Sequence, residues 1–411
     1  VALRVRAARA FPAGLALVNG VAIGRLVPRR QRVLDGDGER GALRYRGYAL
    51  EELVEHSTFL DVAHLLIVGH LPDAAQSHAF ADAVLGHSYL HTNLTELIGS
   101  FRYDAHPMGQ LVSSVAALST FYAEANTALH GNAIYHGAAR SAVALRNKQL
   151  YRLLGKLPTI AAAVYRHRIG RPFNAPATGA RAHALGYAGN FLAMLDTLSD
   201  ATYTPDARLV RALDQLFIVH AEHGLNNSST TLRVVASAGA DPYTCVAAAA
   251  ASLYGPLHGG ASEKVVRMLE RIGSADNVPA FLAKVRARHE LLWGFGHRVY
   301  RAYDPRARVV RRIAATVFDV VQKREPLVDV ALALERAALA DDYFVSRRLF
   351  PNVDFYTGII YRALGIPTDF YPVLFAVGRI AGWLAHWNEL QVTADKRAIV
   401  RPRQVYVGAP P

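Results

Sequence analysis

The chain has 411 residues, of which 52% are hydrophobic and only 19% are charged, so a sizeable core is expected and wholesale disorder is not. Cys245 is the single cysteine, which excludes an intramolecular disulfide and argues against a secreted, disulfide-stabilised class. The apolar stretches are too short, or too often interrupted by charge and proline, to predict a transmembrane helix. We therefore expect no membrane partner.

The formal net charge of +13 comes almost entirely from arginine, because only six of the 46 basic residues are lysine. Nucleic acid, small anionic ligands and simple coding bias are three interpretations of this excess. The arginines are dispersed and do not form a basic tail or a basic–aromatic stripe. Scattered, fixed guanidinium groups suit carboxylates and phosphates better than a nucleic-acid backbone. We therefore expect small anions and no nucleic acid.

The chain begins with a basic, acid-free segment and continues as a mostly helical protein. Residues 1–34 contain seven arginines and no aspartate or glutamate, which resembles the remnant of a targeting segment. A turn is predicted at 35–41, an extended segment at 44–48, and one helix from Leu50 through 71 that Pro72 ends. Periodicity predicts further helices at 75–85, 94–100, 108–123, 139–153, 158–165, 186–198, 207–221, 232–238, 242–253, 263–272 and 278–292.

A dense polar patch spans residues 220–230. His220 and His223 are three residues apart and are predicted to share one face of a helix, where Glu222 could join them in a metal site. The His-Glu-x-x-His spacing is absent, however, and no third ligand is obvious. We therefore expect no metal, and we favour substrate or anion contacts by His223 and Asn227. Structural polar residues are the alternative.

Residues 254–263 form the stretch around which the rest is organised. A helix runs into Gly255-Pro256, then come His258, two glycines and a fresh amphipathic helix. The positive end of that helix disfavours an imidazolium at its start. A neutral imidazole that donates a hydrogen bond is what stabilising an enolate requires. The alternative is a loop histidine with no chemical role.

A second glycine-containing stretch covers residues 294–306. Gly294 and Gly296 allow a ligand to approach the backbone closely, although a lone Gly-x-Gly is weak evidence. His297 follows, with arginines at 298, 301, 306 and 308. The stretch therefore predicts a positive field beside a histidine, and a solvated basic surface is the alternative.

Asp354 stands in an apolar, aromatic setting at residues 351–358. Burial would raise the pKa of its carboxyl group and make it a better proton acceptor. The alternative is that Asp354 caps the helix that follows. Further along, Arg379 lies inside the apolar run 373–384 and looks like a buried charge that needs an anionic partner.

Taken together, these stretches resemble the citrate synthase family. The resemblance extends over about 35–408 and is carried by residues 44–48, 101–108, 255–261, 294–300 and 351–358. Residues 341–345 and 384–387 look most like the plant and algal peroxisomal (glyoxysomal) type. The resemblance implies an all-α fold with a large domain of 1–258 and 366–411 and a small CoA-binding domain of 259–365. It also implies a homodimer and a peroxisomal location, with the mitochondrial matrix as the alternative.

The resemblance further implies condensation of acetyl-CoA with oxaloacetate, then hydrolysis of citryl-CoA to citrate and CoA. No metal or redox cofactor is implied, because acetyl-CoA is a substrate. The implied catalytic residues are His258, His297 and Asp354. The implied oxaloacetate contacts are His223, Arg306, Arg379 and, from the other subunit, Arg401. The implied CoA contacts are Arg301, Arg347, Gly294, Phe295 and Gly296.

Some features depart from the family or leave alternatives open. Gly224 follows His223 where the family usually has glutamate, and we expect it to loosen the helix there. The basic segment 26–32 has no functional account.

A 2-methylcitrate synthase using propionyl-CoA stays open, because one methyl group in a pocket is worth only about 1–3 kcal/mol. A non-catalytic helical protein that binds anions or nucleic acid is the alternative from another class. Cys245 is either inert core or a redox handle.

Overall fold

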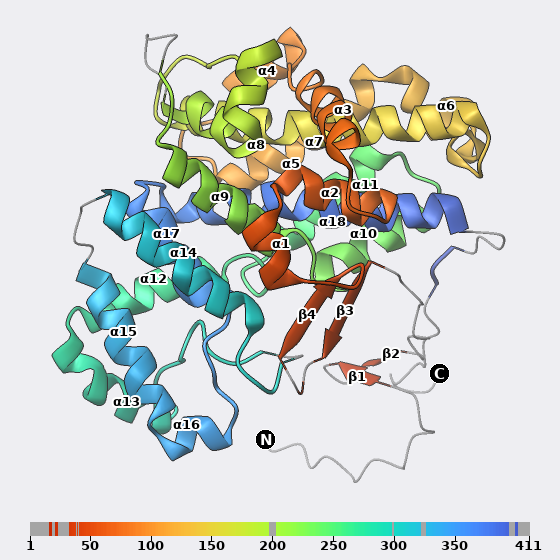
Figure 1. Cartoon of the computed structure of the whole chain (residues 1–411). Coiled ribbons are helices and arrows are strands. Elements are labelled where there is room, and N and C mark those ends of the chain that lie inside the picture. The colour runs from red at the N-terminus through yellow and green to blue at the C-terminus, as the bar shows by residue number, and fades with distance from the viewer. Residues whose placement is uncertain are drawn as a thin grey trace.

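The computed structural model describes residues 16–18, 21–23, 33–37, 39, 41–196, 203–297, 300–321, 326–393 and 399–401. The strands described lie near the N-terminus (Figure 1). They form two small antiparallel sheets, β1 (Ala16–Val18) with β2 (Val21–Ile23), and β3 (Leu34–Asp37) with β4 (Ala42–Tyr45) and β5 (Tyr48–Ala49). Helices form most of the remaining described residues, which confirms the predicted all-α class.

The described α-helices are α1 (Leu50–His56), α2 (Phe59–Val68), α3 (Ala74–Leu85), α4 (Thr92–Gly99), α5 (Pro107–Phe121), α6 (Thr127–His130), α7 (Arg140–Arg168), α8 (Gly179–Asp196), α9 (Ala207–His220), α10 (Asn227–Ser237), α11 (Pro242–Tyr254), α12 (Ala261–Ile272), α13 (Val278–Arg286), α14 (Pro305–Val321), α15 (Pro326–Leu339), α16 (Asp342–Ser346), α17 (Val353–Ala363) and α18 (Tyr371–Thr393). The helices predicted near 75–85, 94–100, 108–123, 207–221, 242–253 and 263–272 are confirmed to within three residues. The extended segment predicted at 44–48 is also confirmed as parts of β4 and β5.

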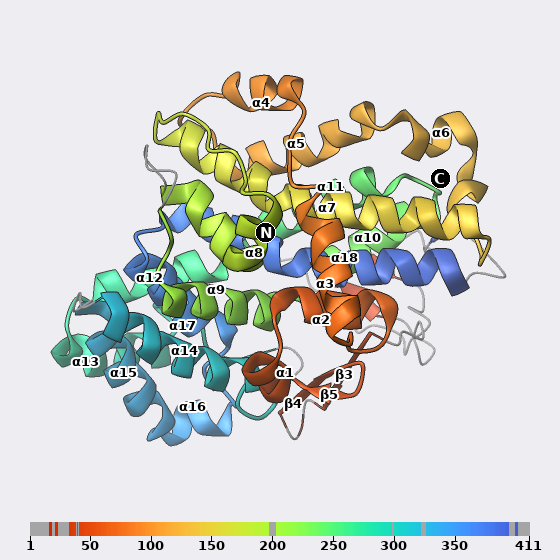
Figure 2. The same ribbon diagram turned by 45° about the horizontal axis from the view of Figure 1, so that its top comes forward.

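Helix α18 is the centre of the core. It crosses the middle of the molecule in both views and packs against α2, α7, α9, α10 and α11 (Figures 1 and 2). From Val373 to Trp387 its hydrophobic side chains are almost completely buried on every face, with Phe375 only partly so. A helix that is apolar all round has to be enclosed by others. Arg379 is 1% exposed, so the prediction of a buried charge at this position is confirmed.

Helices α12 to α17 gather on one side of the molecule, at the lower left of Figures 1 and 2. Within this group α17 packs against α12 and α14, and α15 packs against α12, α13 and α16. Helix α14 also packs against α9, which joins the group to the rest of the molecule. The group falls within residues 259–365, but the division into two domains stays a prediction.

Helix α7 shows how a proline can be accommodated inside a helix. The sequence predicted two helices that break before Pro158, whereas α7 runs through it without interruption. A proline leaves the carbonyl four residues earlier without its helical donor. Here the hydroxyl of Tyr187 donates to the Leu154 carbonyl at 3.0 Å, and Pro158 itself is buried in the core. The prediction was wrong because a side chain from another helix replaces the missing N–H.

The single helix predicted over residues 50–71 is two helices, because Thr58 starts a new one. The Thr58 hydroxyl accepts from the Asp61 N–H at 3.2 Å, and the Asp61 carboxylate accepts from the Thr58 N–H at 3.0 Å. This reciprocal capping box favours a helix start at this point. Gly69, with φ of 111°, ends α2 three residues before Pro72.

Three other helix boundaries differ from the predictions. The helix predicted to start at 186 begins at Gly179 and is kinked at Gly186, whose φ is 65°. The helix predicted to start at 232 begins at Asn227, because the Asn226 side chain accepts from the Ser229 N–H at 3.1 Å and caps it. The helix predicted over 278–292 ends at Arg286, followed by Arg288 in a left-handed conformation with φ of 62°.

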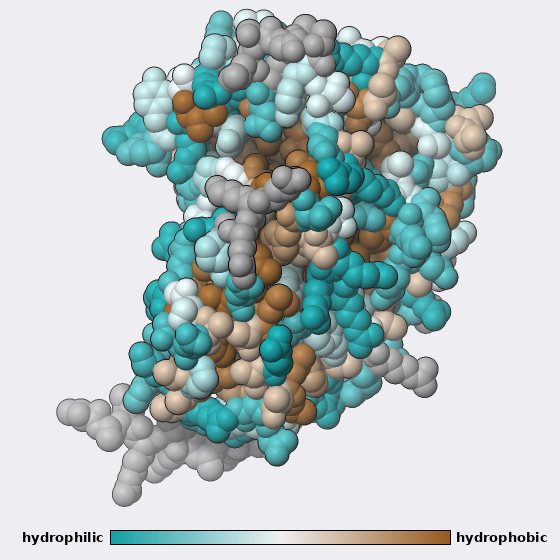
Figure 3. All heavy atoms as spheres, turned by 60° about the vertical axis from the view of Figure 1, so that its left-hand side comes forward, coloured by the Kyte–Doolittle hydropathy of each residue, from teal (hydrophilic) through white to brown (hydrophobic). Residues whose placement is uncertain are grey.

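None of the helices in the described ranges is long and apolar enough to cross a membrane. The face seen in Figure 3 is largely hydrophilic, and hydrophobic atoms are interspersed in a band down its middle. Cys245 is fully buried in α11, and burial raises the pKa of its thiol, which favours inert core over a redox handle. The predicted targeting remnant lies mostly outside the described residues, and segment 26–32 lies entirely outside them.

Candidate active site

The loop after α9 separates the three side chains that had suggested a metal site. Helix α9 ends at His220, so His223 lies beyond it and the two histidines do not share a helix face. The Nε2 atom of His220 meets the Tyr361 hydroxyl at 3.1 Å, and that of His223 meets the Tyr300 hydroxyl at 3.3 Å. Glu222 faces His386 instead. These three side chains diverge, so they offer no common metal position.

The same loop corrects the expectation for Gly224. This residue has φ of 62° and lies outside α9, so it cannot loosen that helix. A side chain at this position would have to adopt the left-handed conformation that glycine tolerates best. The turn at Gly224 therefore carries the chain from His223 into the start of α10.

His258 lies in the turn between α11 and α12, and its hydrogen bonds fix its tautomer. The backbone N–H of Ser228, at the start of α10, donates to His258 Nε2 at 3.3 Å. Because this N–H can only donate, Nε2 is the acceptor and the neutral ring carries its proton on Nδ1. The Ser228 hydroxyl also lies 3.1 Å from Nε2, and it is held by the indole N–H of Trp383 at 3.1 Å.

His297 is oriented in the same manner. The backbone N–H of Tyr300 donates to His297 Nδ1 at 3.2 Å, so the neutral ring carries its proton on Nε2. That Nε2 lies 3.4 Å from an Nη2 atom of Arg306, which is also a donor. The rings of His223 and His297 meet edge to face with their centroids 5.0 Å apart. The Nε2–H of His297 and the Nη2–H of Arg306 are two donors that face each other, and such a pair favours an oxygen acceptor between them.

Gly294 and Gly296 tie His297 to the segment that carries Asp354. The Gly294 carbonyl accepts from the Asn352 N–H at 2.8 Å, and the Gly296 N–H donates to the Phe350 carbonyl at 2.7 Å. Both glycines have positive φ, and a Cβ at Gly294 would lie 2.8 Å from a methyl carbon of Val265. These glycines therefore bring two distant segments together, and at least these two backbone groups are already bonded within the chain. Contact between this stretch and CoA stays a prediction.

Asp304 joins Arg306 to the start of α17. Its carboxylate accepts from Arg306 Nη2 at 2.8 Å and from the Val353 N–H at 3.3 Å. Both Asp304 and Arg306 are almost fully buried, at 1% and 3% exposed. The pair fixes the guanidinium beside His297, on the same framework that holds the N-terminus of α17.

Asp354 is not the cap of α17, so its carboxyl group remains available for chemistry. The capping residue is Asn352, whose side chain accepts from the Asp354 N–H at 3.0 Å. Loss of water around the carboxyl group raises the pKa of Asp354 to about 6, although the positive charge of Arg306 opposes the shift. The alternative role as a helix cap is therefore wrong, and Asp354 is a carboxylate at neutral pH with unusual basicity.

Arg379 is a fully buried guanidinium beneath the site. Its Nε donates to the His220 carbonyl at 2.6 Å, and its charge lies over the Phe375 ring, 4.7 Å from the centroid. Burial lowers the pKa of Arg379 to about 10, and the largest opposing influence is the negative charge of Glu222. Glu222 thus supplies compensating negative charge for Arg379, although the described contacts include no direct ion pair between the two side chains.

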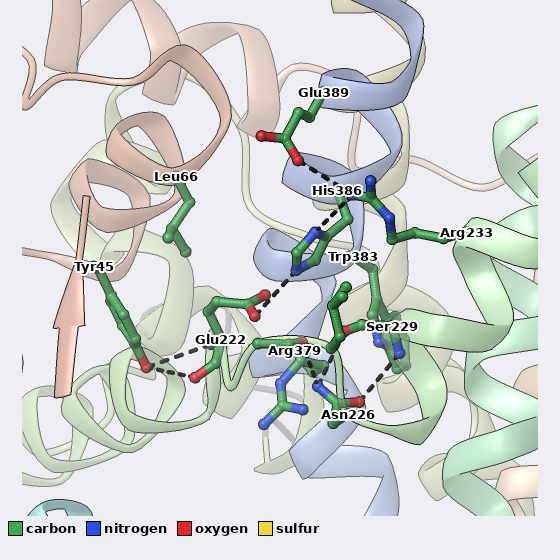
Figure 4. Close-up of polar contacts among 12 residues, drawn as sticks. Tyr45, Leu66, Glu222, Asn226, Ser229, Arg233, Arg379, Trp383, His386 and Glu389 are labelled. Carbon is green, nitrogen blue, oxygen red and sulfur yellow. Dashed lines mark hydrogen bonds and ion pairs between the residues drawn. The ribbon is translucent and has the colours of Figure 1, made fainter. Parts of the chain in front are cut away.

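A buried chain of polar groups holds Glu222 in place (Figure 4). The Glu222 carboxylate lies 3.2 Å from His386 Nε2, and Arg233 Nη1 lies 3.2 Å from His386 Nδ1. Because Arg233 can only donate, His386 accepts on Nδ1 and donates its Nε2 proton to Glu222. Arg233 is paired in turn with Glu389 at 3.1 Å. On the other side, the hydroxyl of Tyr45 donates to the Glu222 backbone carbonyl at 3.0 Å.

The three histidines of the site are neutral at physiological pH. Burial, assisted by the charge of Arg379, lowers the pKa of His258 to about 4. Burial and Arg306 lower the pKa of His297 to about 4 and that of His223 well below its usual value. His223, His258, His297 and Asp354 are all half-buried, whereas Arg306 and Arg379 are almost fully buried. The arrangement offers one carboxylate base, neutral N–H donors and positive charge for a small polyanion.

The remaining predicted contacts lie apart from this centre within one chain. Arg301 is exposed and pairs with Glu39 at 2.7 Å, and Arg348 lies 3.8 Å from the same carboxylate. Arg347 is exposed, and its guanidinium lies 3.8 Å from the centroid of the Tyr343 ring. Arg401 is exposed, and the N–H of the preceding residue, Val400, donates to the Ser237 hydroxyl. No described contact joins Arg401 to the other predicted site residues.

The sequence alone did not assign roles to several supporting residues. Asp304 precedes Pro305, which is a common pattern at a helix start and could have indicated a structural carboxylate. Ser228 stood in the polar patch without a role, and only its distance to His258 gives it one. No signal in the sequence could pair Glu222 with His386, because 164 residues separate them.

Comparison with known proteins identifies the family to which the chain belongs. The family model described as "Citrate synthase, C-terminal domain" matches residues 25–403. The chain is 55% identical to the peroxisomal citrate synthase of Dictyostelium discoideum, over 90% of this chain and 73% of that protein. It is 49% identical to the glyoxysomal citrate synthase of Cucurbita maxima, over 93% of this chain and 72% of that protein. It is also similar to the solved ternary complex of carboxymethyl coenzyme A and oxaloacetate with the Thermoplasma acidophilum citrate synthase (26% identity, TM-score 0.82, 94% of this chain and 95% of that one). The chain therefore belongs to the citrate synthase family, and its function is that of a citrate synthase.

Proposed function

We propose that this chain condenses acetyl-CoA with oxaloacetate at the site around Asp354 and then hydrolyses citryl-CoA to citrate and CoA. The observation that carries the proposal is a single half-buried carboxyl group whose pKa is raised to about 6, with two neutral histidines of opposite tautomer in the same site. The methyl protons of a thioester are weakly acidic. Removing one therefore requires a positioned base and a donor ready for the oxyanion that forms.

In the first step, Asp354 takes a proton from the methyl group of acetyl-CoA. The negative charge moves to the thioester oxygen, where the Nδ1 proton of His258 is the matching donor, since Nε2 is occupied by the Ser228 N–H. A neutral imidazole suits this role, because an imidazolium would also acidify the base beside it. The low pKa of His258, about 4, supports that assignment.

In the second step, the enolate carbon attacks the carbonyl carbon of oxaloacetate. The Nε2 proton of His297 is placed to polarise that carbonyl, since Nδ1 accepts from Tyr300. Arg306 and Arg379 supply two buried positive charges for the two carboxylates, with His223 beside them. We expect Arg401 to complete this site from the second subunit of a homodimer. Water then hydrolyses citryl-CoA, and none of these steps calls for a metal or redox cofactor.

Binding of CoA belongs to the surface arginines Arg301 and Arg347. Both are exposed, and guanidinium groups suit the phosphates of CoA. In this structure Arg301 forms an ion pair with Glu39, so the phosphates of CoA would have to displace the Glu39 carboxylate. We also propose that the segment 294–296 contacts CoA and that residues 259–365 close over it as a small domain.

The location of the enzyme is proposed as the peroxisome, on the support of its similarity to peroxisomal and glyoxysomal relatives. Cell fractionation tests this: activity should sediment with catalase. Activity that sediments with mitochondrial markers would contradict it.

The proposed role of Asp354 predicts the pH dependence of the reaction. The base acts only when ionised, and its pKa is raised from 3.8 to about 6, so activity must be lost as pH falls through that value. We expect kcat/KM for acetyl-CoA to decline about tenfold per pH unit below about pH 6. The histidines add no loss until near pH 4 because they stay neutral. A profile that is flat from pH 7 down to pH 5 would rule out Asp354 as the base.

The buried polar groups around Glu222 predict an effect on the KM for oxaloacetate that is separate from the effect on the base. In Glu222→Gln the amide oxygen can still accept from His386, but the countercharge of Arg379 is lost. We expect KM for oxaloacetate to fall by up to about tenfold, because the positive charge of Arg379 is then left uncompensated for the incoming dianion, and kcat to change much less. Steady-state kinetics with varied oxaloacetate measures this.

Glu335→Gln is the matched control for that experiment. Glu335 is equally buried, at 3% exposed, and binds the hydroxyls of Tyr303 and Tyr356. Its replacement should leave KM for oxaloacetate unchanged. An equal change in KM for both variants, or a rise in KM for Glu222→Gln, would mean that Glu222 has only a general structural role.

A further inference from the structure

A cluster of metal-binding side chains lies where α3 meets α8, outside the active site. His78 and Asp82 are one helical turn apart on α3, and His183 lies on the first part of α8. Within the described ranges, this is the only set of three histidine, cysteine, aspartate or glutamate side chains whose ligand atoms all lie within 4.8 Å of one another. Nothing in the proposed catalytic chemistry uses these residues.

The ligand atoms of this His78–Asp82–His183 cluster lie close enough together to share one ion after small side-chain rotations. One carboxylate oxygen of Asp82 lies 3.4 Å from His78 Nδ1, and the other lies 2.5 Å from His183 Nε2. The two imidazole rings are stacked, parallel within 9° and with centroids 4.6 Å apart, so one ring has to turn about its side-chain bonds before both nitrogen lone pairs face the same ion. Zinc with ligands at about 2.0–2.1 Å in a tetrahedron separates its ligand atoms by about 3.4 Å. The His78–Asp82 spacing already matches, and the other spacings need shifts on the order of 1 Å.

The surroundings allow those shifts and the entry of an ion. The side chains of His78 and Asp82 are 69% and 59% exposed, and that of His183 is 27% exposed. They can therefore change rotamer without repacking the core. Two imidazoles and one carboxylate are a ligand set of intermediate softness, which favours Zn²⁺ over Mg²⁺ or Ca²⁺, since the latter prefer oxygen ligands.

We propose that His78, Asp82 and His183 bind one Zn²⁺ ion, with water as the fourth ligand. The ion replaces the direct contact between Asp82 and His183 and links α3 to the part of α8 that precedes the kink at Gly186. A link between two helices that are distant in sequence stabilises the folded chain, because the unfolded chain does not hold the ligands together.

Titration calorimetry of the untagged full chain with ZnCl₂, in a buffer without chelators, tests this site. We expect one site per chain, no heat of binding with MgCl₂, and affinity at least about tenfold weaker in His183→Ala and in Asp82→Asn. His130→Ala, an exposed histidine on α6, should bind Zn²⁺ like the wild type. Zinc should raise the Tm of the wild type but not that of His183→Ala, which should keep wild-type citrate formation.

Three results would overturn the zinc site. Equal affinity of His183→Ala and the wild type would place the ion elsewhere. Loss of binding in His223→Asn would place it among the active-site histidines. Absence of saturable binding to a chain that still forms citrate would show that the cluster is only a hydrogen-bonded contact between helices, and would leave the proposed function intact.

Discussion

Replacing Asp354 by asparagine is expected to lower kcat by a factor of about 10²–10⁴, the usual contribution of a positioned general base. Asparagine has nearly the same size and cannot accept the proton from the methyl group of acetyl-CoA. The Asn352 cap bonds to the backbone N–H of residue 354, so α17 should start normally in the variant. The measurement is kcat for CoA release, with circular dichroism to confirm that the variant is folded.

Asp214→Asn is the matched control, because Asp214 is also a buried carboxyl group with a raised pKa. Burial raises its pKa to about 7, yet its carboxylate accepts from the Phe59 N–H at 2.9 Å and lies 3.7 Å from Arg211 Nη1, and no described contact joins it to His223, His258 or His297. Its replacement should leave kcat within about twofold of wild type, as for a residue with no part in the transition state. Wild-type turnover by Asp354→Asn would show that another group takes the proton.

Replacing His258 by alanine is expected to lower kcat by about 10²–10³, the usual effect of removing one donor to a developing oxyanion. KM for oxaloacetate should change little, because His258 is proposed to face the thioester. The measurement is again steady-state CoA release, with each substrate varied in turn.

Ser228→Ala separates the role of His258 from that of its surroundings. The tautomer of His258 is set by the backbone N–H of Ser228, which the variant keeps, although the bond from Trp383 is lost. We therefore expect a loss in kcat of less than about tenfold. A loss as large as that of His258→Ala would mean that the hydroxyl, and not the backbone, holds the catalytic histidine.

Much of the candidate site could be predicted from the sequence because short, distinctive segments carry it. His258 and His297 stand beside glycines that the backbone needs: a Cβ at Gly259 would lie 2.2 Å from the Leu253 carbonyl oxygen, and Gly294 is enclosed by Val265 and Phe355. Local pattern also found α12 correctly, because its apolar residues follow helical spacing.

What the sequence could not supply depends on contacts between distant residues. The continuity of α7 through Pro158 rests on the hydroxyl of Tyr187, and no local rule signals it. The end of α9 before His223 rests on a loop that Tyr45 anchors from β4, 177 residues away from Glu222. In both cases tertiary contacts override the local preference, which is why the shared helix face of His220 and His223 was predicted wrongly.

CoA release from acetyl-CoA tests whether this site forms citrate. It is followed with a thiol reagent in the presence and absence of oxaloacetate, for wild type and Asp354→Asn together. Propionyl-CoA is run in parallel. We predict release that requires oxaloacetate, strongly prefers acetyl-CoA and falls by at least about 10² in the variant. Preference for propionyl-CoA would contradict acetyl-CoA as the substrate. No turnover with either, in a folded chain, would contradict the assignment of this site to citrate synthesis.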